Sequence, residues 1–353
     1  MPTSRSNAGQ IGSGQRRAQW GNRIDFCASS HYPVSMIPPG ALPSLFVLLA
    51  GVTLSAFVQA RTADTGVVLA TAFDDNITVY RDIPYDHLAG VDPKLLSLDI
   101  YTSKRGAAAS RDPEPVVVYI HGGGWKIGDK ANPDSGPHKA VTFVSSGFVY
   151  VAINYRLSPT VHHPTHARDV AKALAWVADN IGRYSGDPER IYAMGHSAGA
   201  HLAALVATDE SYLKREGHSL KTIKGDILLD VGAYDIPWVM DHLTEERGRE
   251  LLLSAFGNDP KVWADASPIY HVAAGKDIPP MLVFYTDRPR TSEVSRRFVQ
   301  ALKKAGVPAA AIEARGKNHG SILRDIGEPG DAETQIILEF LRGKSLSEMP
   351  GSI

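Results

Sequence analysis

Short apolar segments and amphipathic segments alternate along most of this chain, and the alternation limits the folds open to it. Residues 116–120 and 149–153 are continuous apolar runs, which are typical of strands buried on both faces of a sheet. Between such runs, Val170, Leu174 and Val177 recur at spacings of four and three, which predicts an amphipathic helix. Strands that alternate with helices predict a largely parallel sheet covered by helices on both faces.

The alternation continues toward the C-terminus. The polar, helix-prone stretch 238–270 interrupts it, and this stretch either covers the active site or decorates the surface. The remaining predicted elements are strands over 96–100, 191–194, 227–229, 281–285 and 309–314, and helices over 294–302 and 336–341.

The chain divides into three predicted parts: an N-terminal segment over 1–60, a catalytic domain over 61–345 and a short tail over 346–353. Residues 1–22 are rich in Ser, Gly, Gln and Arg and have no apolar period, which predicts disorder. Residues 27–60 contain no Asp, Glu, Lys or Arg. The first part therefore differs in composition from everything that follows it.

The N-terminal segment has the features of an export signal. Its apolar core, residues 45–58, is about 14 residues long, shorter than the ~20 of a helix that spans a bilayer. Val58 and Ala60 have the spacing that a signal peptidase reads. We predict export to the periplasm or outside the cell, with cleavage near Ala60 and no stable membrane association. A membrane anchor over 44–58, a cytosolic protein with an unusual tail, and translation from Met36 are the alternatives.

Charge and cysteine content exclude several classes of function. The 37 Lys and Arg residues balance 38 Asp and Glu residues, so the whole chain offers no electrostatic attraction for nucleic acid. The single cysteine, Cys27, can form neither an internal disulfide nor a Cys-rich metal site. The segment 162–166 contains three histidines without a carboxylate or thiol, which favours a solvated loop over a metal site. We predict no metal and no cofactor.

A candidate nucleophile stands at a predicted strand-to-helix turn. Residues 195–199 read Gly-His-Ser-Ala-Gly, directly after the predicted strand 191–194 and before an apolar helix. A serine on such a sharp turn needs small neighbours, and the turn exposes its hydroxyl above the sheet. The start of the following helix favours developing negative charge. The pattern predicts Ser197 as a nucleophile, with a structural glycine turn as the alternative.

A glycine loop supplies candidate hydrogen-bond donors. Residues 121–125 read His-Gly-Gly-Gly-Trp and follow the predicted strand 116–120. Successive glycines expose backbone N–H groups, and donors fixed where an oxyanion forms contribute ~3 kcal/mol each. We predict that the N–H groups of Gly123, Gly124 and Ala198 form an oxyanion hole. A phosphate-binding loop would need a Lys followed by Ser or Thr in register, which is absent here.

Among thirteen histidines, position selects the candidate base. His319 lies in a predicted polar loop after the predicted strand 309–314 and before the last helix, where the base of this arrangement belongs. His196 and His201 flank the serine, and His201 is expected to pack within the helix. His121 is expected to brace the glycine loop.

The acid that orients His319 is expected at the carboxyl end of a strand. Asp287 follows the predicted strand 281–285, and doubly wound sheets place functional groups at such strand ends. We therefore predict Asp287 as the acid that holds His319 in the tautomer that accepts the Ser197 proton. Asp235, after the strand-like residues 227–231, is the second candidate.

Four segments together resemble a known superfamily. They are the glycine loop, Asn-Tyr-Arg-Leu-Ser-Pro at 154–159, Gly-Asp-Pro-Glu-Arg-Ile at 186–191, and the extended serine turn at 195–202. This combination resembles the α/β-hydrolase superfamily over roughly residues 77–341. Within that superfamily, it is similar to carboxylesterases grouped with bifunctional feruloyl and acetyl-xylan esterases and with kynurenine formamidase-like hydrolases.

The resemblance implies an α/β-hydrolase fold with a mostly parallel eight-stranded sheet. It also implies Ser197 as nucleophile, Asp287 as acid, His319 as base and the glycine loop as oxyanion hole. Two features depart from the pattern. His196 stands where hormone-sensitive-lipase-like esterases have an acidic residue, and Asp287 follows Thr286 in a shortened loop instead of a longer one with a glycine.

These observations predict a serine carboxylesterase that acts on small-molecule esters through an acyl-enzyme. An arylformamidase-like amidase and a non-catalytic binding protein are the alternatives. Trp125, directly after the oxyanion donors, is expected either to restrict the acyl side of the substrate or to pack in the core. With no long apolar cap, we expect acetyl to butyryl esters to react fastest.

Overall fold

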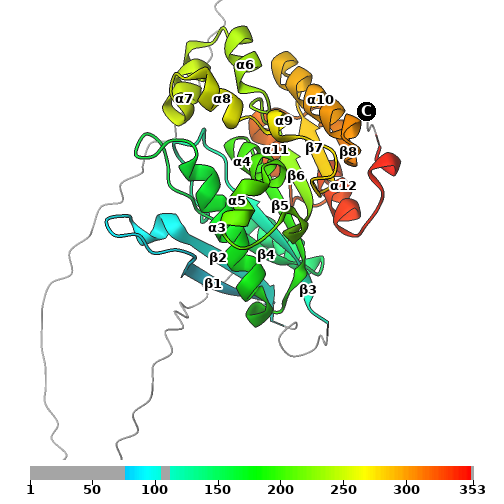
Figure 1. The fold of residues 1–353 in the computed structure, drawn as a ribbon. Coiled ribbons are helices and arrows are strands. Elements are labelled where there is room, and N and C mark those ends of the chain that lie inside the picture. The colour runs from blue at the N-terminus through cyan, green and yellow to red at the C-terminus, as the bar shows by residue number, and fades with distance from the viewer. Residues whose placement is uncertain (1–75, 105–111, 351–353) are drawn as a thin grey trace, which may run out of the picture. The chain divides into compact units, whose positions relative to one another are not determined.

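The computed structural model describes residues 76–104 and 112–350 (Figure 1). Eight strands in these ranges form one sheet in the order β1-β2-β4-β3-β5-β6-β7-β8. The pairs β1–β2 and β2–β4 are antiparallel, and all the other pairs are parallel. The predicted α/β-hydrolase fold, with its mostly parallel eight-stranded sheet, is confirmed.

The predicted strands all lie in this sheet, and those at 149–153 and 281–285 have the predicted bounds. The sequence interpretation missed one strand, β1, which contains Arg81, Asp82 and Pro84 and pairs only with β2 at the edge of the sheet. An edge strand needs no continuous apolar run. The strands are β1 (Ile77–Pro84), β2 (Ser97–Ser103), β3 (Glu114–Ile120), β4 (Val149–Ile153), β5 (Gly186–His196), β6 (Ile223–Leu229), β7 (Met281–Tyr285) and β8 (Ala309–Glu313).

Helices connect the strands, and four of them (α6 to α9) occupy the polar stretch between β6 and β7. The helices are α2 (Pro137–Ser145), α3 (Thr165–Asn180), α4 (Ala198–Thr208), α5 (Glu210–Arg215), α6 (Ile236–His242), α7 (Glu246–Phe256), α8 (Pro260–Asp265), α9 (Pro268–His271), α10 (Pro289–Lys304), α11 (His319–Asp325) and α12 (Ala332–Leu341). Short 3-10 helices are η1 (Pro93–Leu96), η2 (Ile181–Tyr184), η3 (Leu220–Thr222) and η4 (Leu346–Glu348).

Both faces of the sheet are buried. Along β3, Val116 and Val118 belong to one buried cluster, and Val117 and Tyr119 belong to the other. The first cluster includes side chains of α3, α4 and α10, and the second includes side chains of α2 and α12. This two-sided burial explains why the central strands have continuous apolar sequences instead of alternating ones.

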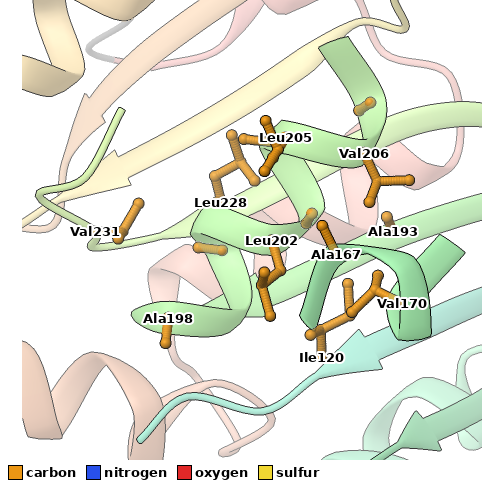
Figure 2. Close-up of a cluster of buried hydrophobic side chains, with 14 of the residues drawn as sticks. Ile120, Ala167, Val170, Ala193, Ala198, Leu202, Leu205, Val206, Leu228 and Val231 are labelled. Carbon is orange, nitrogen blue, oxygen red and sulfur yellow. The ribbon is translucent and has the colours of Figure 1, made fainter. Parts of the chain in front are cut away.

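Helix α4 packs tightly on the first face. Figure 2 shows Leu202, Leu205 and Val206 of α4 among residues of the neighbouring strands, such as Ile120 and Leu228. Burial of a leucine contributes about 1.5–3 kcal/mol. Because α4 begins immediately after the candidate nucleophile, this packing fixes the position of that serine relative to the sheet.

Some predictions concern residues outside the described ranges. The disordered segment and export signal predicted over 1–60 lie there, as does the end of the predicted tail. The start of that tail, by contrast, is packed, because Leu346 and Met349 belong to the second buried cluster. In the described ranges, no helix combines the length and the apolar content needed to cross a bilayer.

Candidate active site

Ser197 occupies a strained turn between β5 and α4. Its φ of 53° lies in the left-handed region, which a non-glycine residue adopts at a cost of about 1–3 kcal/mol. The flanking glycines allow the close packing of this turn. A Cβ on Gly195 would lie 2.4 Å from the carbonyl carbon of Gly199, and one on Gly199 would lie 2.0 Å from the Ile120 oxygen. The predicted strand–turn–helix context of the serine is therefore present.

Strand register brings a carboxylate next to this turn. His196 at the end of β5 pairs with Leu229 at the end of β6, and Leu229 pairs with Phe284 of β7. Ser197 and Asp230 each follow directly on these paired residues. The Ser197 N–H donates to the Leu229 oxygen at 2.9 Å, which ties the two strand ends together.

His319 is the first residue of the short helix α11, where the sequence predicted a loop. The Asn318 side chain caps this helix and accepts hydrogen bonds from the N–H groups of Gly320 (3.0 Å) and Ser321 (2.8 Å). At the other end, the buried Lys139 ammonium donates to the Ile326 oxygen at 3.1 Å. Contacts at both ends therefore hold the helix that carries His319.

Ser197, His319 and Asp230 form a continuous hydrogen-bonded chain. The Ser197 hydroxyl lies 3.0 Å from His319 Nε2, and His319 Nδ1 lies 2.8 Å from Asp230 Oδ2. A carboxylate only accepts, so Nδ1 carries the proton and Nε2 is free to accept the serine proton. This is the geometry required of a nucleophile, a base and an orienting acid.

The prediction of Asp287 as the partner of His319 is wrong. The Asp287 side chain is exposed and makes no hydrogen bond or ion pair within the described ranges. The second candidate, Asp235, caps α6 by accepting from the Trp238 N–H at 3.2 Å and also lies away from His319. The carboxylate on the histidine is that of Asp230, at the end of the neighbouring strand.

One sequence signal could have identified Asp230. It directly follows the apolar run 227–229, so it met the same criterion of strand-end position as Asp287. The sequence interpretation extended that strand to Val231 and thus placed Asp230 inside it. In the structure, β6 ends at Leu229 and Asp230 turns sharply, with a φ of 49°.

Asp230 is fully buried and held by several donors. Oδ1 accepts from the Thr286 N–H at 3.0 Å, and Oδ2 accepts from the Thr286 hydroxyl at 3.0 Å and from Arg288 Nη2 at 2.7 Å. Burial raises the pKa of Asp230, but the hydrogen bond with His319 and the Arg288 charge outweigh burial, so the pKa falls below its usual value. The carboxylate is therefore ionised at neutral pH.

The glycine loop lies beside the serine, as predicted. A Cβ on Gly122 would lie 3.2 Å from the Ser197 Cβ, which shows how closely the loop passes the turn. Gly123 has a φ of 113°, and a Cβ there would lie 1.9 Å from the Ile127 oxygen, so this position requires glycine. Within the described residues, the N–H groups of Gly123 and Gly124 donate to no other group. They are thus available to a substrate oxygen.

Trp125 does not line the cavity next to the serine. Of its two expected roles, substrate contact is wrong and packing in the core is the one observed. Its indole N–H donates to His201 Nδ1 at 3.2 Å, and its ring packs edge-on against His201 and Phe256. Trp125 is 6% exposed. The expectation that His201 packs within its helix agrees with this arrangement, since His201 is also buried and donates from Nε2 to the Ala266 oxygen at 2.7 Å.

Two further histidines brace the site in a neutral form. His121 donates from Nδ1 to the Gly122 oxygen at 2.7 Å and stacks on Tyr155. Burial lowers the pKa of His121 to about 4. His196 donates from Nε2 to the His319 oxygen at 2.9 Å, and burial followed by the charge of His319 lowers the pKa of His196 to about 3. Neither imidazole competes with His319 for protons near neutral pH.

A cavity of about 610 Å³ opens onto Ser197 and His319. Such a volume suits a small-molecule ligand. Leu251 of α7 lies over Gly124, so part of the polar stretch 238–270 does cover the site. The side chains lining the cavity are polar toward α2 and mixed toward α7, and they include Asn132, Ser135, Lys126, Ile127, Arg247, Glu250, Leu251 and Leu323.

No group of three or more His, Cys, Asp or Glu side chains is arranged for a metal ion in the two described ranges. The three histidines of the segment 162–166 have other partners. His162 Nδ1 lies 2.8 Å from the Ser254 oxygen, His163 lies 2.9 Å from the Asp265 carboxylate, and His166 lies 3.0 Å from the Ser158 hydroxyl.

Several known proteins resemble this chain in sequence or in fold. The BD-FAE family model matches residues 98–302, more than half of the chain. The chain belongs to the BD-FAE family. It is 31% identical over 264 residues to esterase LipC of Mycobacterium tuberculosis, a match that covers 71% of this chain and 63% of LipC. It is 28% identical to the kynurenine formamidase of Danio rerio, over 75% of this chain and 82% of that enzyme.

Solved structures agree on the fold of this BD-FAE family member. Esterase B from Lactobacillus rhamnosis superposes with a TM-score of 0.62 at 22% identity, over 77% of this chain and 87% of the esterase. Other relatives are longer than the matched part. The chain covers only 53% of esterase LipQ from Mycobacterium tuberculosis, for example.

Proposed function

We propose that this BD-FAE family member is a serine carboxylesterase that hydrolyses small-molecule esters. The observation that carries the proposal is the hydrogen-bonded chain from Ser197 Oγ through His319 to Asp230, with contacts of 3.0 and 2.8 Å. These three residues lie beside the glycine loop, in which the N–H groups of Gly123 and Gly124 donate to no other group among the described residues. A cavity of about 610 Å³ opens onto Ser197 and His319. The esterase names of several relatives support the same reaction.

The acylation half-reaction follows from the tautomer of His319. Ser197 Oγ attacks the ester carbonyl carbon while its proton moves to His319 Nε2, and the imidazolium then donates that proton to the departing alcohol. Asp230 stabilises the imidazolium and keeps Nδ1 protonated throughout. The products of this half-reaction are an alcohol and an acyl-Ser197 ester.

The deacylation half-reaction repeats these steps with water. His319 Nε2 takes a proton from a water molecule, whose oxygen attacks the acyl carbon, and the proton then passes to Ser197 Oγ as the carboxylic acid leaves. In both half-reactions the carbonyl oxygen becomes an oxyanion. The N–H groups of Gly123, Gly124 and Ala198 would stabilise it, at ~3 kcal/mol for each well-placed donor.

A short-acyl preference remains part of the proposal, but its basis changes. Trp125 is buried away from the cavity, so it cannot narrow the acyl side. Leu251 and Ile127 line the cavity instead and supply only a small apolar surface. We expect acetyl to butyryl esters to react faster than octanoyl esters. The preference should be graded, because one methylene in a pocket changes kcat/KM by only ~10–200-fold.

An amidase is the second candidate. It is favoured by the match to the Danio rerio kynurenine formamidase, of which the chain covers 82%, a larger share than the 63% of LipC. The same nucleophile and base would cleave a formamide. A panel of p-nitrophenyl esters and N-formylkynurenine, compared by kcat/KM, separates the two, and N-formylkynurenine as the best substrate would favour the amidase.

The decisive test is Ser197→Ala. Because the acyl-enzyme cannot form, ester turnover should fall by about 10⁵-fold or more, while the circular dichroism spectrum stays that of the parent. A fluorophosphonate should add once to the parent protein and not to the variant, as measured by intact mass. Ester turnover that survives in a folded Ser197→Ala protein would refute the proposal, and a non-catalytic binding protein would become the better account.

A further inference from the structure

The segment after β7, where the acid was expected, supplies donors to the acid of the neighbouring strand. Thr286 donates to both oxygens of Asp230, and Arg288 Nη2 donates to Oδ2 at 2.7 Å. The same Nη2 lies 3.1 Å from His319 Nδ1. A guanidinium group is therefore held against the edge of the imidazole that faces away from the serine.

Arg288 and His319 do not bond to each other. Arginine only donates, and Nδ1 of His319 already carries the proton that it gives to Asp230. Both groups instead converge on the same oxygen, Asp230 Oδ2. Their 3.1 Å separation places a permanent positive charge next to the ring that must become positive during catalysis.

We propose that Arg288 is a positioning residue that holds the Asp230 carboxylate for His319 and places a permanent positive charge beside the imidazole. This inference rests on the proposed esterase function. A buried carboxylate with its full charge would favour the imidazolium strongly. Arg288 offsets part of that charge, so the imidazole remains able to accept the Ser197 proton in more acidic solution.

Arg288 acts on the triad and not on the substrate. Its side chain is 42% exposed and does not line the cavity next to Ser197. Solvent therefore screens its charge in part, which limits the expected effect. The other charged or titratable groups near His319 are His196 at the end of β5, Arg324 on α11 itself, and, along the cavity that His319 also lines, Lys126, Arg247 and Glu250.

The test compares Arg288→Met with Arg288→Lys and with a matched control. Arg290→Met removes an arginine two residues away that pairs with the exposed Glu245 and does not contact the triad. The measurement is kcat/KM for p-nitrophenyl acetate between pH 5 and 9. In Arg288→Met, the acidic limb should move to higher pH by about 0.5–1 unit, because the offsetting charge is gone.

The remaining variants separate charge from packing. Arg288→Lys keeps the charge, so its acidic limb should stay within about 0.2 unit of the parent, as should that of Arg290→Met. KM should change less than about two-fold in all three variants, since Arg288 does not line the cavity. A fall in the plateau of kcat with no movement of the limb would assign Arg288 a purely structural role and overturn the proposal.

A second measurement can be used for variants that fold poorly, and it distinguishes failure of the Arg288 proposal from failure of the esterase proposal. The rate of Ser197 modification by a fluorophosphonate needs only the folded fraction, and its pH dependence should move with the limb. Arg288→Gln serves if Arg288→Met does not fold. If Ser197 reacts normally but the pH dependence is unchanged without the arginine, the Arg288 proposal alone fails. If Ser197 never reacts in the parent protein, the esterase proposal fails as well.

Discussion

The ends of β6 and β7 look alike in sequence and behave oppositely in the structure. Each strand is a short apolar run soon followed by an aspartate, Asp230 after β6 and Asp287 after β7. Asp230 is fully buried and accepts from the Thr286 N–H, the Thr286 hydroxyl and Arg288, as well as from His319. Asp287 is exposed and accepts nothing among the described residues. One strand end supplies the acid, and the other supplies the groups that hold it.

The difference shows that a position at the end of a strand does not by itself determine which aspartate contacts His319. A buried carboxylate is tolerated only where donors satisfy its oxygens. The three donors on the β7 side satisfy Asp230, and the same backbone path turns Asp287 out into solvent. The acid is therefore selected by the donors around it and not by its place after a strand.

The largest expected difference in kcat is between variants that replace each of these two aspartates with asparagine. Asp230→Asn should lower kcat by ~10⁴, because an amide in place of the carboxylate favours the wrong tautomer of His319. Asp287→Asn should change kcat by less than two-fold, since its side chain is exposed and makes no hydrogen bond or ion pair within the described ranges. Steady-state kinetics with p-nitrophenyl acetate at pH 8 measures both. The reverse ranking would return the role to Asp287.

Residues with a local signature were predictable from the sequence, and residues selected by long-range contacts were not. Ser197 lies between glycines that a strained turn requires, and His319 stands in the segment between the last strand and the last helix. Asp230 depends on donors 56 and 58 positions later in the chain. Trp125 depends on His201 and Phe256, which no local pattern brings together. The edge strand β1 was missed because it needs no apolar run.

An aspartate within β6, Asp226, shows that the same dependence on hydrogen-bond donors affects stability. Asp226 is fully buried, and neither oxygen of its carboxylate has a hydrogen-bond partner among the described residues. Burial raises the pKa of Asp226 well above its usual value, because no hydrogen-bond donor compensates its carboxylate for the loss of water. Asp226 and Asp230 thus lie four residues apart with pKa shifts of opposite sign.

The sign of the pH effect follows from that raised pKa. The folded state binds the Asp226 proton more tightly than the unfolded chain does. Stability is therefore fully present below the unfolded-state value near 3.9. It falls by about 1.4 kcal/mol for each pH unit above that value, until the folded-state pKa is reached. Asp226→Asn removes this loss, so its melting temperature should exceed that of the parent at pH 7 and approach it near pH 4.5.

Calorimetry of both variants across pH 4.5–8 tests this account. The Asp230→Asn protein is the matched comparison, because the pKa of Asp230 is lowered and its ionised form stabilises the fold above the unfolded-state value. Its deficit relative to the parent should therefore stay constant across pH 4.5–8, because the contribution of ionised Asp230 is lost only as the pH falls below the unfolded-state value toward the folded-state pKa. A melting-temperature difference for Asp226→Asn that does not depend on pH would show that Asp226 has hydrogen-bond partners in solution.

Exposed charges that line the cavity should have smaller effects than the buried aspartates Asp226 and Asp230. Lys126 and Arg247 line the cavity, are exposed, and form no ion pair in the described part of the chain. Water and salt screen such charges, so each contributes about 0.2–1 kcal/mol to a partner. Unlike Arg288, they line the cavity, so we expect them to favour esters that carry a second, negatively charged group.

The smallest prediction follows from this screening. For p-nitrophenyl hemisuccinate relative to the neutral p-nitrophenyl butyrate, the ratio of kcat/KM values should fall about two- to five-fold in Lys126→Gln/Arg247→Gln. Glu250→Gln should raise the ratio, because Glu250 is the one acidic residue among the described residues that line the cavity. Lys261→Gln, on α8 outside the cavity, should leave it unchanged. The effect should also shrink between 0.05 and 0.5 M salt, since screening shortens the reach of surface charges. If the ratio does not change when both cations are removed, the negatively charged group of the substrate does not approach α7. Specificity would then be set entirely between the glycine loop and the strand ends.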